Sequence, residues 1–158
     1  MASTLTVDNI VGATAAAKVH ITGHVIQVVE GTTTTQTQHN STSYAATSIT
    51  ATITPSSTSS KILVSVTSNL ETNQAAEFGF YSIHRGSTSI AVSSVGQPSN
   101  TTNSPIFPIA IQKLDSPSTT NAVTYTLYIK RTLATIVANI NSGGTNTLGV
   151  ITLMEIAQ

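Results

Sequence analysis

Apolar and polar residues alternate over most of the chain after residue 23, with the period of two that a strand with one buried face requires. Residues 122–131 give the clearest example, because Val123, Tyr125, Leu127 and Ile129 share one face. Tyr128 then points to the opposite face. The alternating runs, separated by turn-forming residues, predict strands over 24–30, 44–54, 61–69, 77–85, 89–93, 107–114, 122–131 and 149–156.

The connections carry their own signals. Residues 55–60 and 115–120 are rich in Pro and Ser and predict turns, and Arg85-Gly86-Ser87-Thr88 predicts a tight hairpin. Residues 31–43 are nearly all Thr, Gln, Ser and Asn, which predicts an exposed loop or a ragged edge. Residues 133–140 are apolar and fit either a strand or a short helix, and the flanking strands favour a strand.

Eight or nine short strands without a convincing helix indicate an all-β protein. We expect a jelly-roll-like β-sandwich of about eight antiparallel strands. Residues 1–23 differ, since Leu5 and Val7 alternate only loosely and 12–18 are mostly Ala and Gly. They predict an extended N-terminal arm (1–23) followed by the sandwich domain (24–158). An arm of this kind buries nothing alone and usually docks on a neighbour.

Charged residues make up only 8% of the chain, against about 25% in typical proteins. Six Lys and Arg balance six Asp and Glu, so neither a nucleic-acid footprint nor a polybasic membrane anchor is present. Hydroxyls replace the charges, with 29 Thr and 20 Ser among 158 residues. Low net charge promotes association, so we expect a chain that associates with itself.

The sequence lacks cysteine and the patterns that mark secretion or membrane insertion. Cysteine is absent, which excludes disulfides and thiolate chemistry. No signal-peptide pattern and no apolar run near the roughly 18 residues of a membrane span occur. We therefore expect synthesis in the cytoplasm and no membrane insertion.

The histidines offer the first candidate chemistry. His20 and His24 are four residues apart, but that spacing in a strand spans about 13 Å, too far for one ion. Three copies of His24 could still meet on the axis of a trimer, although a solvated histidine is the expected reading. His39 and His84 are expected at the surface, and no metal or cofactor is expected.

The acids offer the second candidate chemistry. Glu71 and Glu77 flank one loop and form the best candidate carboxylate pair, or together with Asn73 and Gln74 a set of oxygen ligands for calcium. Solvated loop charges are the expected reading, because no ordered ligand spacing supports a site. No Gly-x-Ser-x-Gly motif exists. We therefore expect that the protein is not an enzyme.

Three stretches resemble a known group of proteins: 3–10 (STLTVDNI), 53–64 (ITPSSTSSKILV) and 149–156 (GVITLMEI). Together they are similar to small tail-fibre-like and decoration-like virion proteins of tailed bacteriophages. The resemblance implies a homotrimer whose N-terminal arm attaches to other virion proteins and whose sandwich is exposed on the virion. Leu5, Val7 and Ile10 are then the candidate attachment residues.

Three functions remain open. The first is a fibre-like protein that contacts the host surface, including its glycans, through the polar loops 31–43 and 96–105. The second is a decoration (cement) protein that stabilises the head, and the third is a carbohydrate-binding module, which the absence of Trp weakens. The candidate subunit contacts are Leu133, Ile136, Val137 and Tyr128, with a subunit contact favoured over a glycan contact for Tyr128.

Overall fold

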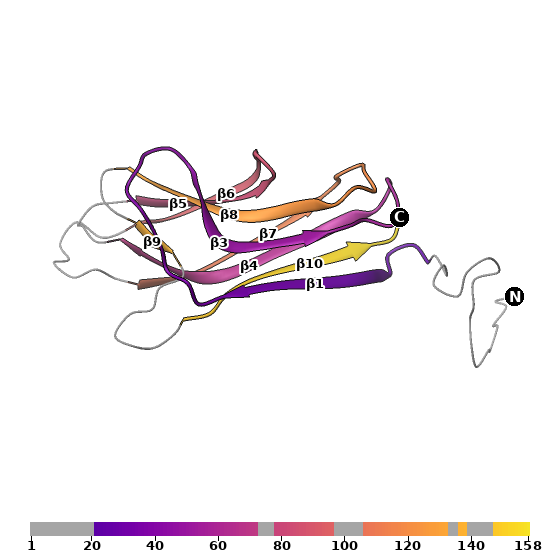
Figure 1. Ribbon diagram of the computed structural model, residues 1–158, viewed down its shortest axis with the longest axis horizontal. Coiled ribbons are helices and arrows are strands. Elements are labelled where there is room, and N and C mark those ends of the chain that lie inside the picture. Colours follow the sequence, from indigo (N-terminus) through magenta and orange to yellow (C-terminus); the bar gives the residue numbers. More distant parts are fainter. Residues whose placement is uncertain (1–20, 73–77, 97–105, 133–135, 139–146) are drawn as a thin grey trace, which may run out of the picture.

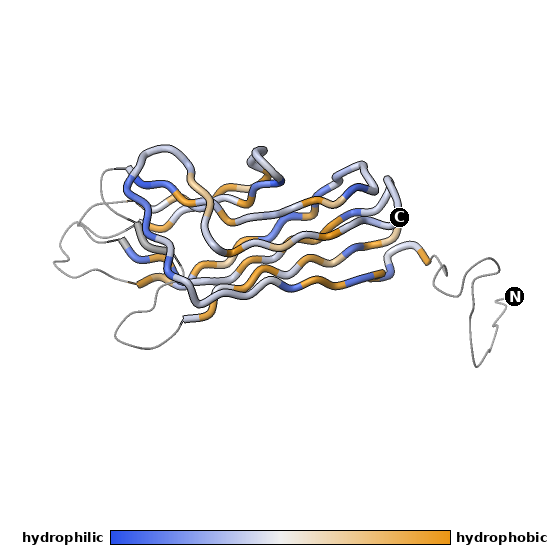
Figure 2. Tube along the Cα trace, viewed as in Figure 1, coloured by the Kyte–Doolittle hydropathy of each residue, from blue (hydrophilic) through white to orange (hydrophobic). Residues whose placement is uncertain are grey.

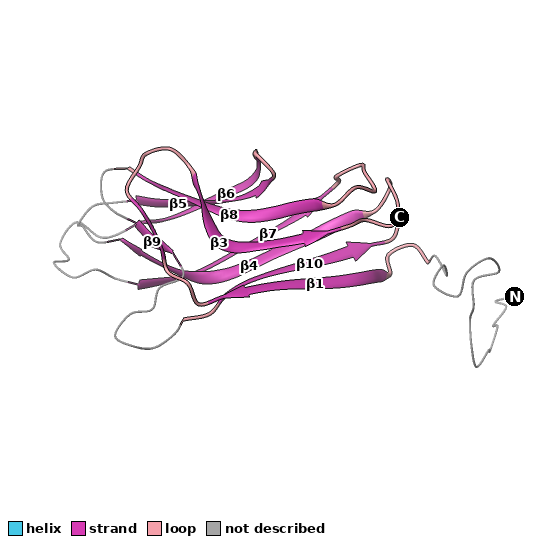
Figure 3. Cartoon of the chain, in the orientation of Figure 1, coloured by secondary structure: helices cyan, strands magenta, loops and turns pink. Residues whose placement is uncertain are grey.

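The computed structural model describes residues 21–72, 78–96, 106–132, 136–138 and 147–158. These residues form two antiparallel β-sheets packed face to face, and no helix occurs among them (Figures 1 and 3). The strands are β1 (Val25–Thr33), β2 (Thr37–His39), β3 (Ala45–Ile53), β4 (Lys61–Thr72), β5 (Phe78–Arg85), β6 (Thr88–Gly96), β7 (Ile106–Asp115), β8 (Val123–Arg131), β9 (Ile136–Ala138) and β10 (Gly149–Ile156).

Sheet A, as we name it, is built on the order β1-β10-β4-β7, and sheet B has the order β3-β8-β5-β6. The two short strands extend sheet A. β9 pairs with the end of β4, on the same side of β4 as β10, which pairs with an earlier part of that strand. β2 in turn pairs with β9. Sheet A is therefore four rows wide along most of its length, like sheet B.

The connections define the topology. β5 and β6 form a hairpin within sheet B, whereas each other step between the eight main strands passes from one sheet to the other. Two four-stranded sheets joined in this way make a jelly roll. The sequence prediction of an all-β sandwich is thus confirmed, and the strand order specifies the jelly-roll form.

The predicted strands all appear, with shifts at their ends. Residues 31–43 are not simply a loop, because β1 continues to Thr33 and β2 follows within the segment. The ambiguous segment 133–140 contains the strand β9. The predicted hairpin at Arg85–Thr88 is confirmed, and Gly86 supplies the positive φ (56°) that such a turn favours.

The core lies between the sheets. Buried residues alternate with more exposed ones along β3, β8 and β10, and Figure 2 shows hydrophobic and hydrophilic residues distributed along the strands of both sheets. Fully buried aliphatic side chains come from both sheets, including Ile49, Ile62, Ile83, Leu127 and Leu153. Their burial supplies the main driving force for pairing the sheets.

The two ends of the sandwich differ. At one end, here called the terminal end, the start of β1 lies beside the C-terminus, and the β3–β4 turn lies next to them (Figure 1). Gly23 N donates to Ala157 O (2.8 Å), and Ala157 N donates to His24 O (2.9 Å). The opposite end, the loop end, holds the β1–β3 connection and the strand ends that flank 73–77 and 97–105 (Figure 1).

Along one side the sandwich is closed by β1 and β3. A Cβ added at Gly31 would overlap the carbonyl oxygen of Thr50, so the two backbones can approach this closely only at glycine. Ser48 strengthens the closure, since its hydroxyl donates to Thr35 O (3.0 Å) and its N–H donates to Thr37 Oγ1 (3.2 Å).

Candidate functional site

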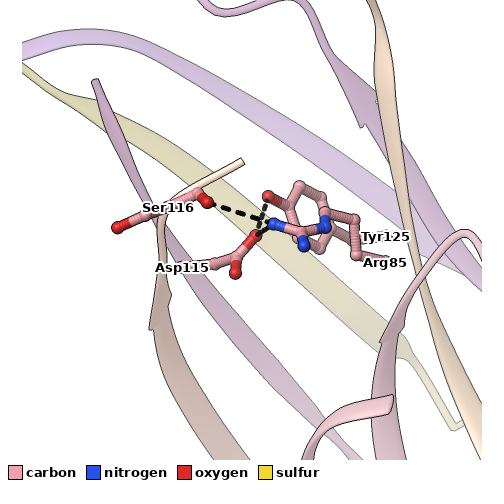
Figure 4. A network of polar contacts seen from close by, with 4 residues as sticks. All are labelled: Arg85, Asp115, Ser116 and Tyr125. Carbon is pink, nitrogen blue, oxygen red and sulfur yellow. Dashed lines mark hydrogen bonds and ion pairs between the residues drawn. The ribbon is translucent and has the colours of Figure 1, made fainter. Parts of the chain in front are cut away.

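A polar cluster lies at the ends of β5 and β7. Arg85 Nη1 donates to Asp115 Oδ2 (2.9 Å) and to Ser116 O (3.2 Å), and the hydroxyl of Tyr125 donates to the same Asp115 oxygen (2.7 Å; Figure 4). Tyr125 and Asp115 are buried. Burial raises the pKa of Tyr125, and the hydrogen bond to Asp115 and its negative charge raise it further, while Arg85 opposes them. Tyr125 is therefore held as a neutral donor.

A second buried carboxylate, Glu155, lies on β10 at the terminal end. It accepts hydrogen bonds from Gln27 Nε2 (2.5 Å), Ser56 N (2.7 Å) and Ser56 Oγ (2.6 Å). Burial alone would raise the pKa of Glu155, but the hydrogen bonds together outweigh it and lower the pKa. The buried Ser60 hydroxyl also favours the charged form of Glu155, although it makes no hydrogen bond within the described residues.

The two carboxylates close the terminal end rather than form a reactive pair. Ile62 of β4 pairs with both Glu155 and Asp115, so the two acids lie on either side of one central strand. Each accepts hydrogen bonds from at least two residues of neighbouring strands or turns. The sequence prediction did not single out either residue, although Glu155 follows Ile151 and Leu153 at an inward position, which is the signal that could have identified it.

The outer face of sheet B carries an aromatic cluster. The His84 ring stacks on Tyr128 (centroids 3.9 Å apart, planes 11°) and meets the edge of Tyr44 (5.5 Å). Lys130 Nζ lies 4.8 Å from the ring centroid of Tyr44 and 5.1 Å from that of Phe80. Two strands, β5 and β8, and the residue before β3 thus contribute rings and a cation to one patch.

His84 corrects a sequence prediction. It was expected at the surface, but it is 6% exposed because Tyr44 and Tyr128 cover it from neighbouring segments. Neither ring nitrogen has a hydrogen-bond partner within the part of the chain that the structure describes. Burial lowers the pKa of His84, although the backbone of Ser87 opposes this shift. His84 therefore acts as a neutral packing group.

The outer face of sheet A carries a row of apolar side chains. Val28 of β1 pairs with Met154 of β10, Met154 pairs with Leu63 of β4, and Leu63 pairs with Leu114 of β7. None of the four is buried, and the two on the outermost strands are the most exposed, Val28 at 57% and Leu114 at 46%. We call this set the apolar row.

The predicted subunit contacts do not form one surface. Tyr128 lies on sheet B, with its ring against His84, whereas Ile136 and Val137 belong to β9 in sheet A. Leu133 lies outside the described residues, as do the predicted attachment residues Leu5, Val7 and Ile10. The inward position predicted for Tyr125 is confirmed, since it is fully buried.

The predicted ligand candidates are dispersed. His24 is exposed just before β1, and His39 lies in β2, where its Nε2 is 2.9 Å from Ser43 O. Glu71 is half-buried near the end of β4, while Asn73, Gln74, Glu77 and His20 fall outside the described residues. Among the residues that the structure describes, no group of three or more His, Cys, Asp or Glu side chains could hold a metal ion.

One further property concerns membranes. Over the described ranges, the chain has no helix with the length and apolar character that a membrane span needs.

The comparisons with known proteins find similarity among solved structures. No protein-family model and no curated protein matches the chain. Among solved structures, a chain in the structure of infectious bursal disease virus Gt strain matches the whole of this chain at 9% identity and a TM-score of 0.41. This chain spans 43% of the length of that one. The similarity is too distant to bear on function or assembly.

Proposed function

We propose that the chain is a structural protein of a tailed-bacteriophage virion, assembled as a homotrimer. Its N-terminal arm (1–23) anchors it to other virion proteins, and the sandwich is exposed and contacts the host surface. The proposal includes no catalytic step and no cofactor. It rests on the resemblance of the sequence and on one structural observation, the opposed ends of the sandwich.

The opposed ends suit an anchored, outward-facing module. The arm joins the sandwich at the terminal end, where Gly23 and His24 pair with Ala157 and two buried carboxylate clusters tie the turns together. The loop end lies at the other end of the strands, and β4 with its 12 residues is about 40 Å long. A rigid scaffold of this kind holds recognition loops away from the anchor.

Two other functions fit parts of the same layout. A head decoration protein would use the same arm and the same exposed sandwich, so the opposed ends support it equally. A carbohydrate-binding module is favoured by the aromatic cluster of sheet B, because rings such as Tyr44 and Phe80 are partly exposed beside Lys130. The carbohydrate-binding module leaves the arm and the resemblance to virion proteins unexplained, whereas the decoration protein accounts for both.

Light scattering after gel filtration tests the assembly and the anchor. We expect the full chain to have a molar mass near three times 16.3 kDa. A variant that begins at Ile21 keeps the Gly23–Ala157 hydrogen bond, so it should remain a trimer. It should, however, no longer co-sediment with particles stripped of this protein, whereas the full chain should.

The milder variant L5S/V7S/I10S controls for the length of the deletion and should also lose co-sedimentation. A monomeric full chain would contradict the trimer. Equal binding of the full chain and both arm variants to particles would contradict the anchor.

A further inference from the structure

We propose that His84 and Tyr44 form an acid-sensitive latch, in which protonation of His84 releases Tyr44 and the segment 40–44 from the outer face of sheet B. The inference goes beyond the proposed function and does not depend on the homotrimer or its anchor. It rests on the way in which the aromatic cluster of sheet B covers one imidazole ring.

His84 is buried on a face that no second sheet covers. The preceding Ile83 points into the core and is fully buried, so His84 points to the outer face of sheet B. His84 is nevertheless only 6% exposed, because the ring of Tyr128 stacks on it and the ring of Tyr44 packs against it at an angle. The cover therefore consists of side chains of the same face, which can move without unpacking the core.

The covered ring has no hydrogen-bond partner. Neither Nδ1 nor Nε2 of His84 forms a hydrogen bond within the described residues, although both atoms are buried. A neutral imidazole leaves one donor and one acceptor unsatisfied in this position, whereas an imidazolium leaves two donors and a charge. Burying an unpaired charge costs far more than burying an unpaired polar group. The closed latch therefore accepts His84 only in its neutral form.

The rings around His84 supply no counter-charge. Tyr44 and Tyr128 stay neutral in acid, because an ordinary tyrosine loses its proton only near pH 10 or so. The charged group of the cluster is the ammonium of Lys130, which lies 4.8 Å from the ring centroid of Tyr44. A second positive charge beside this ammonium is repelled.

The other neighbours do not rescue the cation. On β6, Ser89 lies beside His84 in the register, and its hydroxyl pairs with another hydroxyl on β5 (2.8 Å). Arg85, the next residue of β5, donates instead to Asp115 on the inner side of the sheet. Burial lowers the pKa of His84, and the backbone of Ser87 opposes this shift without outweighing it.

Tyr44 is the part of the cover that can move. Tyr128 lies in β8, whose backbone pairs with β3 on one side and with β5 on the other. Tyr44 precedes β3, and its segment is tied to the sheet by Arg131 N, which donates to Ser41 O (3.2 Å). Release of the segment breaks this hydrogen bond, gives His84 access to water and uncovers the rings of Tyr44 and Tyr128.

The ratio of open to closed molecules depends on pH through His84. The open form binds a proton near the ordinary histidine pKa of about 6.5, whereas the closed form binds it only at lower pH. The ratio is therefore constant at neutral and higher pH and rises as the pH falls below about 6.5. Between about pH 7.5 and pH 5 the open form gains at most about thirtyfold.

Amide hydrogen exchange of the full chain, followed by NMR at pH 7.5 and pH 5 and corrected for intrinsic rates, measures this ratio. We expect the protection of the Arg131 amide, which donates to Ser41 O, to fall by about ten- to thirtyfold at the lower pH. Amides of β4, the central strand of sheet A, report on global unfolding and should change by less than about twofold. Equal changes at Arg131 and in β4 would contradict the latch.

Two histidine variants identify the group that takes up the proton. His84→Phe keeps an aromatic ring in the stack but cannot be protonated, so the fall in protection should disappear. His39→Gln is the matched control, because His39 Nε2 lies 2.9 Å from Ser43 O in the same segment, and this variant should keep the fall. A fall that persists in His84→Phe, or that disappears in His39→Gln, would overturn the proposal.

Tyr44→Ala tests the latch from the other side and does not depend on the folding of His84→Phe. Without the cover, the His84 ring should titrate closer to the ordinary pKa of about 6.5 than it does in the wild type. NMR of the histidine ring protons follows both titrations. The same midpoint in the two proteins would show that Tyr44 does not hold His84 in its neutral form.

Discussion

Glu155 shows how a carboxylate is kept charged at the edge of an apolar core. It has no ion-pair partner among the described residues. Instead it accepts one hydrogen bond from Gln27 and two from Ser56, which join β1 and the β3–β4 turn to β10. Three good donors can replace the water that burial removes. Glu155 therefore stabilises the terminal end only while it is ionised.

The Glu155→Gln variant tests this role. The substituted amide presents N–H groups to donors, so we expect it to lower the free energy of unfolding by about 1–3 kcal/mol at pH 7. The pKa of Glu155 is lowered in the folded state. The unfolded chain therefore binds its proton first as pH falls, and the contribution of Glu155 is complete above its ordinary pKa and lost below the lowered one.

The measurement is urea unfolding at pH 7 and at about pH 3. The gap between wild type and Glu155→Gln should shrink at the lower pH. Glu71→Gln, at a half-buried position on the outer face of sheet A, is the control and should change stability by less than about 0.5 kcal/mol at either pH. A gap that is the same at both pH values would show that the charge of Glu155 is not what stabilises the fold.

Individual side chains were the hardest part to predict from the sequence. The inward position of Tyr125 follows from alternation along one strand and was correct. His84 was placed wrongly because its cover comes from Tyr44 and Tyr128, which are distant in sequence. The Arg85–Asp115 pair likewise joins residues 30 positions apart. Such contacts depend on strand order, which the local pattern does not contain.

At the scale of elements, alternation was sufficient wherever one face is buried. Strands such as β8 and β10 appear because apolar residues recur at every second position, and the hairpin appears because Arg85-Gly86-Ser87-Thr88 suits a two-residue turn. β2 was missed because its three residues, Thr, Gln and His, have no apolar face. Its position depends on pairing with β9, which only the tertiary fold supplies.

The contact between β1 and β3 gives a prediction at this scale. In Gly31→Ala the new methyl group would overlap the Thr50 carbonyl oxygen, which is backbone and cannot rotate away. We expect β1 to move from β3 and the free energy of unfolding to fall by about 1–3 kcal/mol. Thermal unfolding measures the change, with Thr32→Ala at the adjacent exposed position as the control. An unchanged melting temperature for Gly31→Ala would show that the two strands are not held this closely.

For the whole molecule, the decisive features are the jelly-roll topology and its two unlike ends. The sequence predicted a sandwich with an N-terminal arm, but the ends emerged only with the strand order. The terminal end joins the arm, the C-terminus and the buried carboxylates, whereas the loop end faces the other way. The same topology serves viral capsid and lectin domains alike. The arm and the sequence resemblance therefore support the virion proposal more than the fold does.

The most direct measurement is immunogold electron microscopy of purified phage particles from the source of this chain, with an antibody to the sandwich. The proposal predicts gold at the tail tip or fibres, removed when the antibody is first saturated with the purified protein. Gold over the head surface would contradict host contact and support decoration instead. Particles that carry no label, and no peptides of this chain by mass spectrometry, would contradict a virion role.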